Sequence, residues 1–203
     1  MGMNREDTIL DGKDLRGIYD QPTDIAVKKV LPQLDDHFRN YIELSPFLVL
    51  STVRDDGYCD ASPRGDAPGF VKVIDDKSIF LPDRPGNNRL DSMTNILKNP
   101  GIGMLFMIPG LEETLRINGT ARIVSDVNLL ASSMVRGKTP RSGLHISIHE
   151  CYIHCGKALR RSKLRQMPGL FQPPQRRRGQ RWGGQSPVSL RPLLPPLPQS
   201  ASA

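Results

Sequence analysis

The fold of this chain is decided by residues 47–92, which read FLVLSTVRDDGYCDASPRGDAPGFVKVIDDKSIFLPDRPGNNRLDS. The first residues, 47–53, are apolar and β-branched and predict a buried strand, and Asp55-Asp56-Gly57 is a hairpin turn signal. The same strand–turn–strand pattern recurs between residues 70 and 81, with its turn at the paired aspartates. A short helix is expected over residues 89–97. The segment therefore predicts antiparallel strands that lead into a helix N-terminus.

Cationic and amide side chains fall at the strand ends and turns of this segment. Residues 62–69 hold two prolines and two glycines, so we expect an irregular path there and not a strand. Guanidinium groups pair bidentately with phosphate oxygens, and the free N–H groups of a first helical turn add donors. The segment thus predicts a site for the phosphate end of a nucleotide-like ligand, built from Arg64, Arg84, Asn87, Asn88 and Arg89.

A simpler explanation exists for two of these arginines. Arg84 and Arg89 could form surface ion pairs with Asp83 and Asp91, which are usually weak. The presence of Arg64 and of the Pro-Gly-Asn-Asn turn favours phosphate binding over this alternative.

The flanking sequence predicts more strands and a few helices. Alternation is clearest at residues 114–124, where Arg116 and its neighbours at every second position share a polar face. Before the first strand, Thr23-Asp24 is a plausible helix start, and Pro32 predicts a second short helix with proline in its first turn. Further elements are expected as strands at 102–108 and 145–154, a helix at 126–134, and a helix or turn at 156–164. This pattern predicts a mainly β fold, a small β-barrel with flanking helices.

Composition divides the chain into three parts. Residues 1–22 lack periodicity and are expected to form a loosely ordered arm, followed by one domain over 23–164. Residues 165–203 carry eight prolines, four glycines and six arginines without an acid, which predicts a disordered tail. A proline-rich ligand for a recognition domain is the alternative for this tail.

The net charge of +7 comes from this tail, because the 22 basic residues before position 165 nearly balance 21 acids. We therefore expect no nucleic-acid partner. No apolar run approaches the length of a membrane span, and the polar, acidic first residues lead us to expect no signal peptide. Three cysteines form no even disulfide framework, which suggests a reducing, cytoplasmic setting.

The sequence offers few other catalytic or metal-binding patterns. Strand geometry would place His154 on the opposite face from His149, Cys151 and Cys155, so no metal site is expected. Glycine-rich nucleotide fingerprints and a Ser/His/Asp arrangement are absent.

Three motifs, in colinear order, resemble the FMN-binding proteins related to pyridoxamine 5′-phosphate oxidase. They are Ser62-Pro63-Arg64-Gly65-Asp66, Pro82-Asp83-Arg84-Pro85-Gly86-Asn87-Asn88-Arg89, and Glu113-Thr114-Leu115-Arg116-Ile117-Asn118-Gly119. The resemblance covers about residues 20–164. It implies an FMN-binding split barrel and a homodimer with FMN in a cleft formed by both subunits.

The resemblance also implies cofactor contacts, residue by residue. Ser62, Pro63 and Arg64 look like strand-end flavin contacts, and Leu81 and Pro82 sit where backbone groups run beside the ring. Arg84, Asn88 and Arg89 look like the phosphate and ribityl contacts. Thr114 occupies the place of a glutamine that bonds the pyrimidine edge, and Arg116 follows on the same strand face, aimed at ligand or substrate.

The resemblance ends at Leu164, where Arg165 stands in place of an expected tryptophan. A shifted reading frame near the 3′ end of the coding sequence is one hypothesis for that break. The expected function is an FMN-dependent oxidoreductase acting on a small-molecule substrate. The alternatives are a non-catalytic flavin carrier, and a haem- or nucleotide-binding protein on the same barrel.

Overall fold

The computed structural model describes residues 11–163, and the chain divides into two compact units between Val30 and Leu31. The predictions of a disordered tail and of an altered C-terminus lie outside the described residues. In the first unit, α1 (Gly12–Ile18) begins at a capping box formed by Asp11 and Asp14. Within the segment that was expected to form a loosely ordered arm, these residues are helical. The second helix, α2 (Asp24–Lys28), is capped by Thr23 as predicted.

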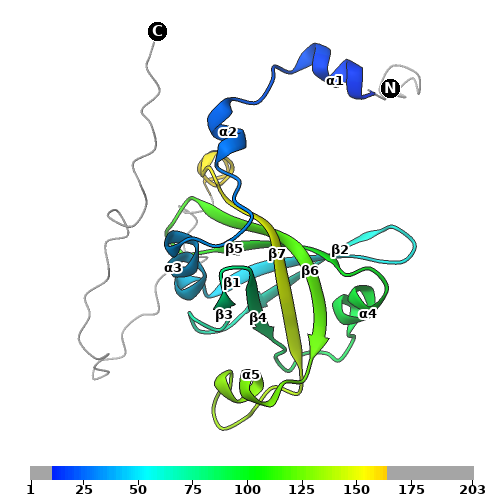
Figure 1. The fold of residues 1–203 in the computed structure, drawn as a ribbon, viewed down its shortest axis with the longest axis vertical. Coiled ribbons are helices and arrows are strands. Elements are labelled where there is room, and N and C mark those ends of the chain that lie inside the picture. The colour runs from blue at the N-terminus through cyan, green and yellow to red at the C-terminus, as the bar shows by residue number, and fades with distance from the viewer. Residues whose placement is uncertain (1–10, 164–203) are drawn as a thin grey trace, which may run out of the picture. The chain divides into compact units, whose positions relative to one another are not determined.

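The second unit is built on one antiparallel sheet of seven strands in the order β2-β1-β5-β6-β7-β4-β3 (Figure 1). The mainly β fold class is confirmed. Two strands have the predicted bounds, four differ from prediction by one or two residues at their ends, and no bounds were predicted for β2. The strands are β1 (Phe47–Val53), β2 (Cys59–Gly65), β3 (Lys72–Asp75), β4 (Ser78–Pro82), β5 (Gly101–Met107), β6 (Thr114–Val124) and β7 (Gly143–His154).

One prediction about β2 is wrong. Residues 62–65 were expected to be irregular, but they pair with β1, with Pro63 opposite Val49. Proline has no backbone N–H, so it removes a ladder hydrogen bond from a central strand, but it is tolerated on an edge strand where that position faces away from the neighbouring strand. Because β2 is an edge strand, Pro63 costs no ladder hydrogen bond.

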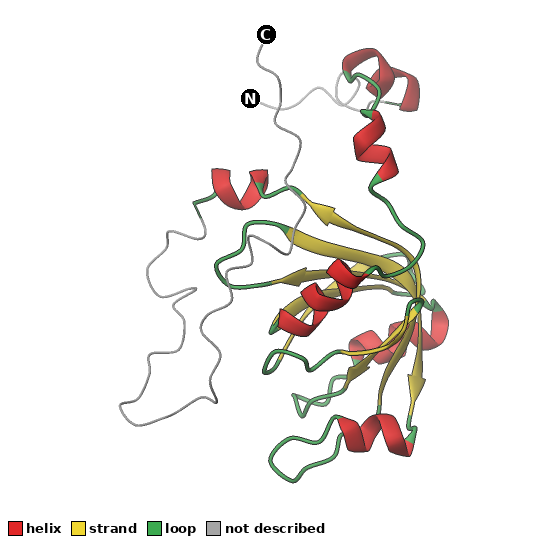
Figure 2. Ribbon diagram, turned by 60° about the vertical axis from the view of Figure 1, so that its left-hand side comes forward, coloured by secondary structure: helices red, strands yellow, loops and turns green. Residues whose placement is uncertain are grey.

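Helices pack at the sides of this curved sheet (Figure 2). The first of them, α3 (Asp36–Leu44), buries Phe38, Tyr41 and Ile42 and is capped by Asp35. Pro32 is not in its first turn as predicted, because Leu31 instead forms an isolated β-bridge with Cys151. The other helices of this unit are α4 (Asp91–Lys98), α5 (Val127–Ser132) and α6 (Lys157–Arg161).

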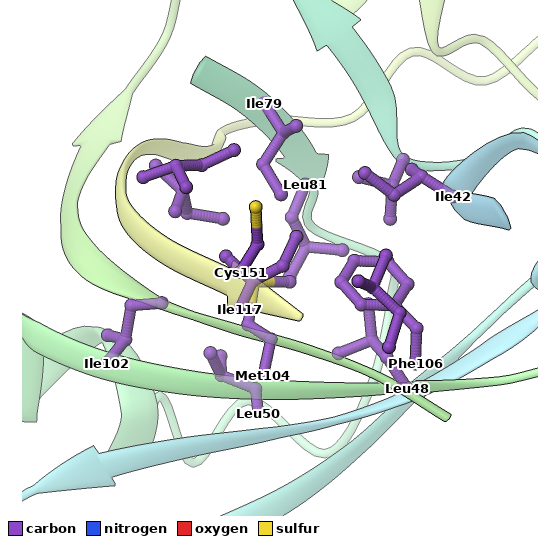
Figure 3. Close-up of a cluster of buried hydrophobic side chains, with 14 of the residues drawn as sticks. Ile42, Leu48, Leu50, Ile79, Leu81, Ile102, Met104, Phe106, Ile117 and Cys151 are labelled. Atoms are coloured by element: carbon purple, nitrogen blue, oxygen red, sulfur yellow. The ribbon is translucent and has the colours of Figure 1, made fainter. Parts of the chain in front are cut away.

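The hydrophobic core lies on one face of the sheet (Figure 3). Strand register explains its composition, because Leu48, Phe106 and Leu115 are directly paired neighbours on β1, β5 and β6 and are fully buried. Directly paired residues of antiparallel strands share a face, and residues alternate between faces along each strand. The side chains of β2 that share this inner face are Asp60, Ser62 and Arg64.

In the described part of the chain, no helix has both the length and the apolar character that crossing a bilayer requires.

Candidate functional site

Arg64 connects β2 to the start of α4. Its Nη2 donates a 3.1 Å hydrogen bond to Ser92 Oγ, and Ser92 is buried in the first turn of the helix. Arg64 Nε is also buried and has no hydrogen-bond partner among the described residues. Ser92 was missed as a site residue, although its position just inside the predicted helix after Arg89 could have indicated it.

The N-terminus of α4 is left without a side-chain cap. Leu90 occupies the cap position with φ 61°, and Asn88 also has a left-handed φ of 60°. Side chains adopt this region at a cost of roughly 1–3 kcal/mol, and such strain clusters at ligand-binding positions. The result is a first turn whose N–H groups are not satisfied by the cap residue, adjacent to the Arg64 guanidinium.

Arg84 is held from two directions. Its Nε lies 2.6 Å from Asp66 Oδ2, and its Nη1 donates a 2.7 Å hydrogen bond to the carbonyl oxygen of Ser133. The Nε–Oδ2 contact is a close charge contact without hydrogen-bond alignment. Asp66 directly follows β2, and Ser133 is the C-cap of α5. The side chain therefore joins three segments of the fold.

The carboxyl of Asp83 interacts electrostatically with both Arg64 and Arg84. Burial raises the pKa of its carboxyl, while the charges of Arg64 and Arg84 act in the opposite direction. Its backbone N–H donates to the Ser142 carbonyl oxygen at 3.0 Å, which fixes the chain where it leaves β4. Arg64 and Arg84 are thus brought to one place, with a partly buried acid beside them.

Arg89 forms the ion pair that the simpler explanation anticipated. Its Nε donates to Asp91 Oδ2 at 2.8 Å, and this hydrogen bond raises the pKa of the arginine. The charge of Asp60, on the inner face of β2, contributes in the same direction. The exposed Arg89 therefore lies within electrostatic reach of the strand that carries Arg64.

The remaining residues on this side are fixed by sheet pairing. Leu81 and Pro82 are buried on β4, opposite Leu144 and Gly143. Ser62 is half-buried on β2, while Pro63 points to the outer face.

Thr114 and Arg116 lie on the other face of the sheet. The register places Arg116 in one row with Leu105, Val49 and Pro63, whereas Arg64 belongs to the inner row. Arg116 donates through Nη1 to the Tyr152 hydroxyl at 3.1 Å and lies 5.7 Å from the centre of that ring. Within one chain, the predicted cofactor contacts therefore form two groups separated by the sheet.

The cysteines and histidines of β7 do not form a cluster. In the described residues, no group of three or more His, Cys, Asp or Glu side chains could hold a metal ion. Cys151 is buried, with its Sγ 3.2 Å from the Gln33 carbonyl oxygen, and Cys59 and Cys155 are exposed.

These features define a class of protein: a split antiparallel barrel with a cationic corner where β2, the exit of β4 and the first turn of α4 meet. A family model described as pyridoxamine 5′-phosphate oxidase matches residues 34–155, and the chain belongs to that family.

Several solved structures are similar to this chain. HupZ from Group A Streptococcus is 17% identical, with 59% of this chain and 93% of that chain covered and a TM-score of 0.49. An FMN-binding protein from Syntrophomonas wolfei is 12% identical, with 57% and 80% covered and a TM-score of 0.43. An F420 reductase is 17% identical, with 60% and 98% covered and a TM-score of 0.41. No match is found among the curated proteins.

Proposed function

We propose that this protein is an FMN-dependent oxidoreductase acting on a small-molecule substrate. The observation that carries the proposal is the hydrogen bond from Arg64 to Ser92, which holds a guanidinium beside the uncapped start of α4. Charge-assisted donors and unsatisfied N–H groups in one place are what a phosphate monoester requires.

The residues at this corner fit the phosphate end of a flavin. The buried Nε of Arg64 and the first-turn N–H groups of α4 are donors without a partner or a cap in the described chain. Asn88 and Arg89 would add phosphate and ribityl contacts, Ser62 and Pro63 would line the strand end, and the backbone of Leu81 and Pro82 would run beside the ring. When bound, the flavin supplies two-electron chemistry, while the chain binds and orients it.

Thr114 and Arg116 enter this proposal through a second copy of the chain. They lie on the sheet face opposite Arg64, which supports a site to which two chains contribute. Membership of the family supports a homodimer with the flavin at the subunit interface. In that arrangement Arg116 would orient the substrate or the pyrimidine edge of the ring.

Mixing two variants tests the shared site. Arg64→Gln and Arg116→Gln homodimers should each bind FMN weakly. Unfolding and refolding the two variants together should produce mixed dimers. In each mixed dimer one of the two sites has both arginines, so about half of its sites should bind FMN as the wild type does. If the mixture binds no better than the two homodimers, the two arginines do not meet across an interface.

The first experiment is the absorbance spectrum of the purified full-length protein, with the released chromophore identified by mass. Flavin bands support the proposal, whereas a Soret band would indicate haem. Arg64→Gln should weaken FMN binding by about ten- to a hundredfold, because a charge-assisted contact contributes roughly 1.5–3 kcal/mol. The control is Arg54→Gln, which removes an arginine paired with Asp56 in the exposed β1–β2 turn.

Turnover separates an enzyme from a flavin carrier. Catalysis would be shown by oxidation of pyridoxine 5′-phosphate or of a reduced nicotinamide, measured as the loss of visible flavin absorbance when the flavin is reduced. Bound flavin with no turnover on either substrate class would favour the carrier. The free thiols of Cys59, Cys151 and Cys155 support a reducing, cytoplasmic location.

A further inference from the structure

We propose that Arg84 is a positioning residue that places Arg64, and that it does not itself contact the bound phosphate. This inference rests on the proposed function, because it concerns how the same corner is held ready for an anion. It departs from the motif-based expectation that Arg84 is a phosphate ligand.

The charge of Arg84 is already matched by a carboxylate. Its Nε is 2.6 Å from Asp66 Oδ2, and both side chains are only about a quarter exposed, at 23% and 24%. A phosphate would have to compete with that carboxylate, whereas the charge of Asp83 acts on both arginines and does not distinguish them. Arg64, by contrast, contacts the neutral Ser92 hydroxyl and forms no ion pair within the described residues. Of the two guanidiniums, Arg64 is the one available to an anion.

The contacts of Arg84 connect opposite borders of the sheet. Strand β2 forms one border, while β4 lies next to the other border strand, β3. Arg84 follows β4, Asp66 follows β2, and the Ser133 carbonyl oxygen ends α5. Cations bind well to the carbonyls at a helix C-terminus, so the second contact is favourable in its own right.

Arg64 depends on this connection because of its position in the chain. It lies two residues before Asp66, on the edge strand β2, which has a strand neighbour on one side only. The Asp66–Arg84 pair fixes the end of that strand relative to the exit of β4. Loss of the pair would let the end of β2 move, and the Arg64 guanidinium would leave its place at the start of α4.

Whether Asp66→Asn weakens or tightens FMN binding tests the proposal. If Arg84 positions Arg64, then Asp66→Asn and Arg84→Gln each weaken FMN binding by about three- to tenfold, and the double variant is no weaker than the worse single one. If Arg84 is a phosphate ligand, Asp66→Asn frees a cation and tightens FMN binding. Tighter binding by Asp66→Asn, or additive losses in the double variant, would overturn the inference.

The dependence of FMN affinity on salt gives a second readout. A variant that removes a cation from contact with phosphate makes binding less sensitive to ionic strength. Arg64→Gln should flatten this dependence, whereas Arg84→Gln should leave its slope as in the wild type. A flattened slope for Arg84→Gln would contradict a positioning role.

Thermal unfolding without flavin separates this inference from the proposed function. Each single change should lower the unfolding midpoint by about 2–4 °C, and the double variant should fall no further than the larger single effect. Independent, additive shifts would show that Asp66 and Arg84 do not act as a pair, and would overturn the inference whether or not FMN binds. The matched control is the exposed Arg54–Asp56 pair, where Arg54→Gln and Asp56→Asn should change neither midpoint nor affinity. If the wild type binds no FMN, the proposed function fails. The unfolding measurements on the single and double variants still test whether Arg84 and Asp66 act as a pair that joins the end of β2 to the exit of β4.

Discussion

Asn95 Nδ2 on α4 donates a 2.9 Å hydrogen bond to Thr52 Oγ1 on β1, and both side chains are buried. The same amide nitrogen lies 3.5 Å from Asp60 Oδ2 on β2. This polar contact under the helix fixes the rotation of α4 against the two strands. Because Ser92 is one turn earlier on the same helix, the contact also sets where the helix presents Ser92 to Arg64.

Thr52→Val should therefore destabilise the protein. It leaves the buried Asn95 amide without its closest acceptor, which costs about 1–3 kcal/mol of unfolding free energy. Denaturant unfolding measures the loss. The control is Thr94→Val on the exposed side of α4, where the change should stay within about 0.5 kcal/mol. Equal effects at both positions would show that the buried hydrogen bond adds nothing.

Ser92→Ala should weaken FMN binding by about two- to tenfold, since it removes the acceptor that orients Arg64. Ser92→Thr keeps the hydroxyl and should recover most of the affinity. Flavin fluorescence titration measures both variants, with Ser132→Ala, an exposed helical serine on α5, as the control. An unchanged affinity for Ser92→Ala would mean that Arg64 does not need this contact.

Asp83→Asn should raise both stability and anion affinity near neutral pH. Burial raises the pKa of Asp83, so the stability linked to its protonated form is present below about pH 3.8 and is lost as the carboxyl ionises. The variant should thus be more stable than the wild type at pH 7, and the difference should vanish in acid.

Removing the negative charge of Asp83 beside Arg64 should also tighten FMN binding by about two- to fivefold. Asp56→Asn, in the exposed β1–β2 turn, is the charge-matched control. Weaker binding by Asp83→Asn would show that this carboxylate helps to hold the arginines in place.

Cys151 should resist thiol reagents in the folded protein. Burial raises the pKa of its thiol to about 12, so about one molecule in ten thousand carries the thiolate at pH 8. A chromogenic disulfide should titrate Cys59 and Cys155 quickly, and Cys151 only after denaturant is added. Rapid reaction of all three thiols would contradict the buried position of Cys151.

The same shift predicts a loss of stability at alkaline pH. Because folding raises the pKa of Cys151, the linked stability is complete below about pH 9 and declines as the pH approaches 12. Burial raises the pKa of Tyr41 as well and acts in the same direction. In Cys151→Ala the free energy of unfolding should decline less steeply with rising alkaline pH than in the wild type, as measured by denaturant unfolding at a series of pH values.

Gly119→Ala should destabilise the protein by about 3 kcal/mol or more. A Cβ there would lie 2.0 Å from the Ser147 backbone oxygen, where β6 and β7 shift register, so the two strands would have to separate. Gly17→Ala is the control, because its Cβ would meet nothing within 4 Å. Folding of Gly119→Ala with wild-type stability would mean that this part of the sheet opens easily.

Much of the fold could be predicted because its signals are local. The alternation of residues 114–124 and the apolar run of 47–53 gave the bounds of β6 and β1, since side chains on a strand alternate between faces. Thr23 as a helix cap followed from its hydroxyl. Pro63 was placed outside any strand because the sequence does not show that β2 is an edge strand.

By itself, the sequence determined the mainly β fold and the cationic character of residues 64–89, from which phosphate binding is predicted. Only the tertiary structure decided which of those cations Asp66, Asp91 and Ser92 engage, and that Arg116 faces away from Arg64. The physical reason is range. The face of a strand on which a side chain lies follows from the two-residue period of the backbone. The neighbours of that side chain across the sheet depend on the order in which distant strands pair.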